Sequence, residues 1–128
     1  MKEKDFQTLF NRWLKHSWSD GSAAFELKIV HGSSLPFDSV KPHQADALFL
    51  AKHHVLIHKI PDLGSLNPFD CYILKVADAY VVVMFYERGA KTFYMIDIDD
   101  WINETITSNR KSLTQERAKE IGIEYTLK

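Results

Sequence analysis

The sequence predicts an α/β (α+β) fold in which helices flank one mixed central β-sheet. Residues 4–16 carry apolar side chains three and four positions apart, which is typical of an amphipathic helix. Residues 23–30 and 79–87 are largely apolar runs of strand length. Helices and strands alternate in the first half of the chain, and strands follow one another in the second half. This order favours a sheet that contains both parallel and antiparallel neighbours.

The first half of the chain is expected to hold two helices and two strands. The stretch before Pro42 is rich in Gly, Ser and Pro, which indicates a loop, and a helix is expected just after Pro42. In order, we expect a helix at 4–16, a turn at 17–22, a strand at 23–30, a loop at 31–42, a helix at 43–54 and a strand at 55–60.

The second half is expected to continue as a meander of strands followed by helices. Ala77 and Asp78 would join a hairpin, and the apolar run at 81–86 predicts a central strand that is covered on both faces. In order, we expect a loop at 61–68, strands at 69–76, 79–87 and 91–98, and helices at 99–106 and 112–122.

The last helix carries its own start and stop signals. Ser112 and Gln115 have the spacing of a capping box, and Gly122 is a residue at which helices commonly end. We therefore expect one domain over residues 1–128, in which residues 108–128 form a C-terminal helical extension.

Composition restricts the class of protein. The 128 residues are 45% hydrophobic and 26% charged, which is typical of a soluble globular domain. The sequence shows no signal peptide and no apolar run long enough to cross a bilayer, so we expect no membrane partner. The single cysteine favours a reducing, cytoplasmic location. A net charge of −1 means that any nucleic acid would be held by a local patch or through bound metal.

Glu26 and Lys28 are the first candidate functional pair. They alternate with Phe25, Leu27 and Ile29 along the predicted strand, so they share the face opposite these core residues. If that face meets solvent, the pair is an ordinary surface feature. If it faces a cavity, the carboxylate is a ligand for Mg²⁺ and the lysine stabilises charge on a phosphate, which suits metal-dependent phosphodiester hydrolysis.

The helix that follows opens with further candidates. Gln44 lies in its first turn, where it either orients substrate or water or is a plain surface residue. His43 could cap the helix, contact phosphate or face solvent. Lys41, His43 and Lys59 are the candidate nucleic-acid contacts, although an exposed strand lysine is the commoner explanation for Lys59.

These residues resemble a known family. The strand "FELK", a loop with Ser and Pro, the helix start "HQADAL" and the hydrophobic strand after it are similar to the core of the PD-(D/E)XK nuclease superfamily. The closest likeness is to Holliday-junction resolvases of the RecU type and their small phage-encoded relatives. The resemblance covers about residues 5–100 and implies a restriction-endonuclease-like core that binds Mg²⁺ or Mn²⁺.

The resemblance also implies roles for individual residues. Glu26 would be a metal ligand, Lys28 the catalytic lysine and Gln44 the active-site glutamine. The family places a further aspartate on a strand that precedes the E-x-K strand, and this chain departs from that pattern because no such strand fits before Glu26. Asp70 is our first candidate for the missing ligand if its strand pairs beside residues 23–30; Asp20 ranks second and Asp62 third.

The leading hypothesis is therefore a Mg²⁺-dependent endodeoxyribonuclease that resembles a junction resolvase and acts in recombination or replication. Its partners would be DNA, including branched DNA, and a second copy of the chain, because symmetric cleavage of a branched substrate would require a homodimer. A competing hypothesis is a catalytically inactive nuclease-fold module that binds DNA or a protein partner. A third is a structural interaction domain with no link to nucleic acid.

The remaining polar residues favour structural roles. The acidic cluster Asp97, Asp99 and Asp100 more often ends a strand and caps the next helix than binds metal. His53, His54 and His58 match no zinc-binding spacing and are expected to face solvent or to cap. Cys71 lacks an evident basic partner, which argues against a nucleophilic role.

Overall fold

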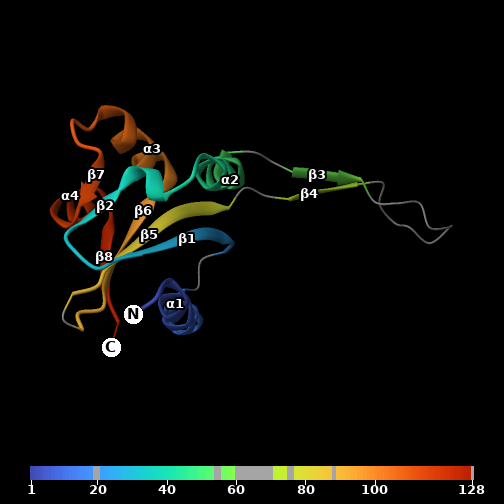
Figure 1. Cartoon of the computed structure of the whole chain (residues 1–128). Coiled ribbons are helices and arrows are strands. Elements are labelled where there is room, and N and C mark those ends of the chain that lie inside the picture. The colour runs from blue at the N-terminus through green and yellow to red at the C-terminus, as the bar shows by residue number, and fades with distance from the viewer. Residues whose placement is uncertain (19–20, 54–55, 60–70, 75–76, 88, 128) are drawn as a thin grey trace.

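A four-stranded mixed sheet with helices on both faces forms the centre of the structure (Figure 1). The computed structural model describes residues 1–18, 21–53, 56–59, 71–74, 77–87 and 89–127, with residues 56–59 and 71–74 described by their backbone. The predicted α/β class is confirmed. The elements in chain order are α1 (Glu3–Ser17), β1 (Ala23–Val30), β2 (Ser34–Pro36), η1 (Phe37–Ser39), α2 (Pro42–His53), β3 (Leu56–Lys59), β4 (Cys71–Leu74), β5 (Asp78–Phe85), β6 (Thr92–Asp97), α3 (Ile98–Thr107), β7 (Ser112–Thr114), α4 (Gln115–Ile121) and β8 (Ile123–Thr126).

The main sheet has the strand order β1-β5-β6-β8. β1 and β5 run parallel, with Glu26 opposite Val81, while β5–β6 and β6–β8 are antiparallel. A parallel pair needs a long crossover connection, and α2 lies within the one between β1 and β5. β1 and β8 are therefore the two edge strands of this sheet.

One face of the sheet is covered by α1 (Figure 1). Phe6 and Phe10 of this helix are almost fully buried, and they pack in one cluster with Val82, Met84 and Phe93. The amphipathic helix predicted from the apolar spacing at residues 4–16 is thus confirmed, with Phe6 and Phe10 in the core. Phe25, Leu27 and Ile29 of β1 pack against the same cluster, as the alternation along that strand predicted.

The opposite face is covered by α2, α3 and α4 (Figure 1). Leu48, Trp101 and Ala118, one from each of these helices, are buried in a second cluster with Val81 and Val83 of β5. β5 is consequently buried on both faces, which explains its continuous apolar sequence and confirms the prediction. None of the described helices has the length and apolar character needed to span a bilayer.

The expected hairpin between residues 69–76 and 79–87 is wrong. β4 pairs with β3 in an antiparallel hairpin of its own, with Ile57 opposite Ile73, and this hairpin lies apart from the main sheet (Figure 1). β5 instead pairs with β1 and β6. The two residues between the expected strands suggested a tight turn, but the apolar surface of β5 is buried by its pairing with β1 and β6 and by the helices on both faces.

The C-terminal region is only partly helical, so the expected helical extension over 108–128 needs correction. Ser112–Thr114 forms β7, which pairs with β2, and the side chain of Thr114 rather than Ser112 caps α4 by accepting a hydrogen bond from the Arg117 amide. Gly122 ends the helix as predicted. β8 then adds to the main sheet beside β6, so this region contributes to the core.

Candidate functional site

Glu26 and Lys28 form a direct ion pair on β1. The Nζ atom of Lys28 lies 3.3 Å from Oε1 of Glu26, and their side chains are 26% (Glu26) and 14% (Lys28) exposed. A lysine that is this well screened from water interacts with nearby negative charge more strongly than a fully solvated one does. The structure therefore brings together the two residues that the sequence singled out first.

The pair lies on the α2 side of the sheet. Ala24 and Val30, which share the alternation of Glu26 and Lys28, pack against the cluster that contains Leu48 of α2. This placement agrees with the expectation that the acid and the amine face away from the core residues Phe25 and Leu27. Within the described residues, neither charged group forms a hydrogen bond or ion pair with a third side chain.

Gln44 has a local role in the structure. Its Oε1 atom accepts a hydrogen bond of 2.9 Å from the backbone amide of Lys41, which is the residue before α2. This is the N3-to-N-cap half of a capping box, and it satisfies an amide at the helix start. No described contact joins Gln44 to Glu26 or Lys28. Lys41 and His43 are exposed at the same helix start.

Several predicted site residues lie outside the described residues. This applies to Asp20, Asp62 and Asp70, and to the side chain of Lys59, whose backbone belongs to β3. The pairing that would have set the strand after Asp70 beside β1 is not found, because β4 pairs with β3. Among the described side chains, no group of three or more His, Cys, Asp and Glu residues is arranged to hold a metal ion.

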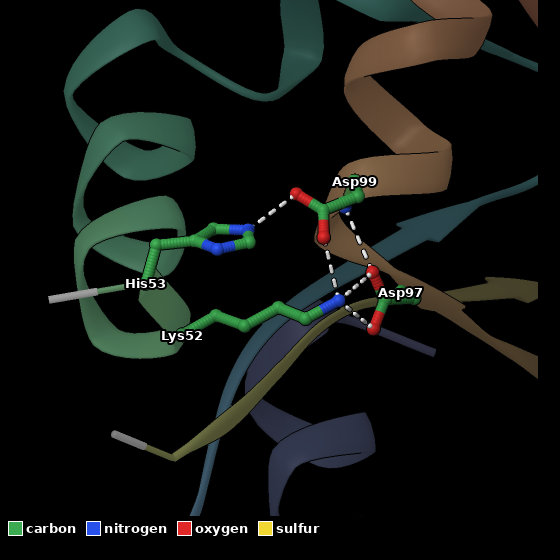
Figure 2. Close-up of polar contacts among 4 residues, drawn as sticks. All are labelled: Lys52, His53, Asp97 and Asp99. Atoms are coloured by element: carbon green, nitrogen blue, oxygen red, sulfur yellow. Dashed lines mark hydrogen bonds and ion pairs between the residues drawn. The ribbon is translucent and has the colours of Figure 1, made fainter. Parts of the chain in front are cut away.

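A second polar cluster joins α2 to the start of α3 (Figure 2). Nζ of Lys52 lies 2.7 and 2.8 Å from the two carboxylate oxygens of Asp97 and 2.6 Å from Oδ2 of Asp99. Nε2 of His53 lies 2.7 Å from Oδ1 of Asp99. Asp97 is also the N-cap of α3, because its side chain accepts a hydrogen bond from the Asp99 amide.

The hydrogen bonds within this cluster shift the pKa values of Lys52 and Asp99. The hydrogen bonds that the Lys52 ammonium group donates, first to Asp97 and then to Asp99, raise the pKa of Lys52 well above its ordinary value. Hydrogen bonds from Lys52 and His53 lower the pKa of Asp99. An amine that holds its proton this firmly is neither a base nor a nucleophile at neutral pH. The cluster is an ion-pair network that fastens the end of α2 to β6 and α3.

Only the two aspartates of this network have roles that were predicted from the sequence. Asp97 and Asp99 were expected to end a strand and cap a helix, and the cap at Asp97 is confirmed. His53 was expected to face solvent or cap, and Lys52 was not singled out. The favourable position of cations in the last turn of a helix was the available signal for these two residues.

The comparisons with known proteins gave no match. No protein-family model, curated protein or solved structure matches this chain. The resemblance to the nuclease superfamily therefore stays a prediction, made from the sequence alone and chiefly from Glu26, Lys28 and the "HQ" helix start. The chemistry open to this site follows from a carboxylate and an ammonium group held on one strand face beside a helix.

Proposed function

We propose that this chain is a divalent-metal-dependent endonuclease that hydrolyses phosphodiester bonds in DNA, like the junction resolvases that its motifs resemble. The observation that carries the proposal is the Glu26–Lys28 pair, 3.3 Å apart and largely screened from water on the sheet face covered by α2. An acid that binds a hard cation and an amine that binds a phosphate oxygen are the two groups that this reaction needs side by side.

Glu26 suits Mg²⁺ or Mn²⁺ because a carboxylate oxygen is the ligand type that these cations prefer. Mg²⁺ is commonly held by one or two carboxylates together with waters and substrate phosphates, so a small protein ligand set is sufficient. We propose Asp20 as the second ligand, because the strand pairing on which the candidacy of Asp70 depended is not found. The bound ion would supply Lewis-acid polarisation of the phosphate and an activated water.

Lys28 would stabilise the negative charge that grows on the phosphate oxygens during hydrolysis. Its partial burial strengthens this interaction, because the surrounding medium screens less than bulk water. In the free protein Glu26 holds the ammonium group, so the amine is already positioned before substrate binds. Lys41 and His43 at the exposed start of α2 would contact the DNA backbone, where the positive end of the helix dipole also attracts phosphate. We propose that Lys59 contacts the DNA backbone as well.

Cleavage of linear and four-way branched DNA with Mg²⁺ or Mn²⁺ tests the proposal. We expect cleavage that a chelator stops and that Lys28→Ala reduces at least about a hundredfold, since losing a charge-stabilising group of this kind typically costs that much. Lys4→Ala, which removes an exposed lysine on α1, is the matched control and should cleave normally. A purified protein that cuts neither substrate with either metal would refute the proposal.

A second candidate is a nuclease-fold module that binds DNA or a protein partner without cleaving. It is favoured by one observation: among the described residues, no group of three or more potential metal ligands includes Glu26, whose carboxylate is already paired with Lys28. This module would bind DNA equally well with and without chelator. Binding by phosphate contacts would still weaken steeply with added salt, whereas an affinity for protein alone would not.

A further inference from the structure

Among the described residues, β1 has one unpaired hydrogen-bonding edge. It pairs with β5 alone among the described strands. The carbonyl of Val30 accepts a hydrogen bond of 2.8 Å from the Tyr86 amide, and the carbonyl of Ser22 accepts one of 3.2 Å from the Asp78 amide. In a parallel ladder every second residue directs both backbone groups to the same neighbour, so the even-numbered residues of β1 bond to β5. The odd-numbered residues direct theirs away from the sheet: Ala23, Phe25, Leu27 and Ile29.

The charged side chains are placed symmetrically about the middle of this edge. Glu26 and Lys28 lie on either side of Leu27, whose N–H and C=O groups point outward. A second β1 strand running antiparallel about a two-fold axis at Leu27 would set each Glu26 opposite Lys28 of the second copy. These would be non-hydrogen-bonded pairs, in which side chains approach most closely.

We infer that β1 is the docking edge for a second copy of this chain, which pairs with it in antiparallel fashion centred on Leu27. The two four-stranded sheets would then join into one continuous sheet across the axis. Exposed edges with unpaired backbone groups are the usual templates for such pairing. The pairing would create two new ion pairs between copies and would satisfy the outward backbone groups of Phe25, Leu27 and Ile29.

The charges also select this register over its neighbours. The odd-numbered residues carry the outward backbone groups, so they must pair with odd-numbered residues of the second copy. The two-fold axis must therefore pass through a residue of β1, and the nearest alternative centres are one residue to either side of Leu27. A centre at Glu26 sets two glutamates against each other, and a centre at Lys28 sets two lysines against each other. Like charges directly opposite are destabilising in antiparallel pairs. The centre at Leu27 is the one of these three that pairs opposite charges.

A groove borders β1 on the side of α1. This groove of about 260 Å³ is lined on the strand side by Phe25, Glu26 and Leu27, and on the helix side by residues that include Glu3, Gln7 and Asn11. The inference does not depend on the proposed cleavage, because the pairing uses backbone groups and needs no metal. The charged side chains of both copies would form one cluster, so this dimer would present a single composite site.

Sedimentation of the full chain over the micromolar range tests the inference. The wild type should be a dimer whose dissociation is unaffected by chelator. Glu26→Lys sets lysine against lysine at both positions and should weaken the dimer about tenfold or more. The double variant Glu26→Lys with Lys28→Glu restores opposite charges and should restore the dimer. A monomeric wild type, or a dimer that the single variant leaves unchanged, would overturn the inference.

Mixing the two single variants supplies an independent test. Glu26→Lys has lysine at both positions 26 and 28, and Lys28→Glu has glutamate at both. Two copies of the same variant therefore place like charges opposite each other, whereas one copy of each variant places opposite charges together. We expect a mixed dimer from the mixture and weaker self-association of each variant alone, with unchanged circular dichroism as the check on folding. Failure to form the mixed dimer overturns the edge pairing, while metal-dependent DNA cleavage by the wild type would still stand by itself.

Discussion

Lys52 and Asp97 join two parts of the fold that lie 45 positions apart in the sequence. The ammonium group of Lys52, in the last turn of α2, donates to both carboxylate oxygens of Asp97, which ends β6 and caps α3. The same group donates to Asp99 at 2.6 Å. One side chain therefore holds α2 against the junction between the sheet and α3.

Lys52→Met should destabilise the protein. Methionine keeps the length of the side chain but leaves two neighbouring carboxylates without their cation. We expect the free energy of unfolding to fall by about 1–2 kcal/mol, because hydrogen bonds between charged groups that are partly screened from water contribute on this order. Urea denaturation at neutral pH measures the change. Lys111→Met, at an exposed position, is the control, and an equal loss there would contradict the assignment.

The ion-pair network around Lys52 makes the free energy of unfolding depend on pH. The pKa of Asp99 is lowered below its ordinary value of 3.8 by hydrogen bonds from Lys52 and His53. The contribution of ionised Asp99 to the free energy of unfolding is fully present above the ordinary pKa of 3.8. It is lost as pH falls through the lower pKa of the folded state. The pKa of Lys52 is raised, so its contribution is complete below the ordinary value of 10.5 and is lost only as pH rises through the folded-state pKa.

The stability difference between wild type and Lys52→Met should therefore be largest in the middle of the pH range. It should shrink below about pH 4 as Asp99 takes up a proton. Urea unfolding of both proteins across a pH series measures this difference. A difference that stays constant into strong acid would show that the carboxylates do not respond to Lys52.

Much of the fold could be predicted from local sequence because local patterns determine local structure. The spacing of Phe6 and Phe10 predicted α1, and the unbroken apolar run of β5 predicted a strand covered on both faces. Strand partners could not be predicted in the same way. β5 pairs with β1 through a long crossover, and nothing in the apolar run of β5 specifies that partner.

In the candidate site, too, only the features that local sequence determines could be predicted. The shared face of Glu26 and Lys28 follows from the alternation of side chains along a strand, and it was predicted correctly. The network of Lys52 with Asp97 depends on how α2 packs against α3, which no short motif encodes. The capping role of Gln44 could have been found, because Lys41 and Gln44 have the N-cap to N3 spacing around a helix that was expected to start after Pro42.

Gln44 allows the capping role and the proposed catalytic role to be separated. Gln44→Ala removes the oxygen that accepts from the Lys41 amide and should lower stability by about 0.5–1 kcal/mol. Gln44→Glu keeps an acceptor at this position and should retain that stability. Thermal or urea unfolding measures both variants. If Gln44→Glu keeps its stability but loses DNA cleavage, the amide also serves the reaction; equal stability of all three proteins would contradict the cap.

Gly122 is required by the close approach of α4 to β6. A Cβ atom at this position would lie 2.9 Å from the carbonyl oxygen of Met95, 2.9 Å from Cγ1 of Ile96 and 3.0 Å from the carbonyl oxygen of Ala118. Backbone oxygens cannot move without shifting β6 or the last turn of α4. Gly122→Ala should therefore destabilise the protein by about 1–3 kcal/mol, the usual cost of overpacking.

Gly32 provides the matched control for this substitution. A Cβ atom added at Gly32 meets nothing within 4 Å, so Gly32→Ala should leave stability within about 0.5 kcal/mol of wild type. Urea denaturation of the two variants side by side measures the difference. Because β8 begins directly after Gly122, its pairing with β6 should weaken in Gly122→Ala, which faster amide exchange at Ile123 and Tyr125 would report. Equal stability of the two variants would show that the end of α4 can shift at little cost.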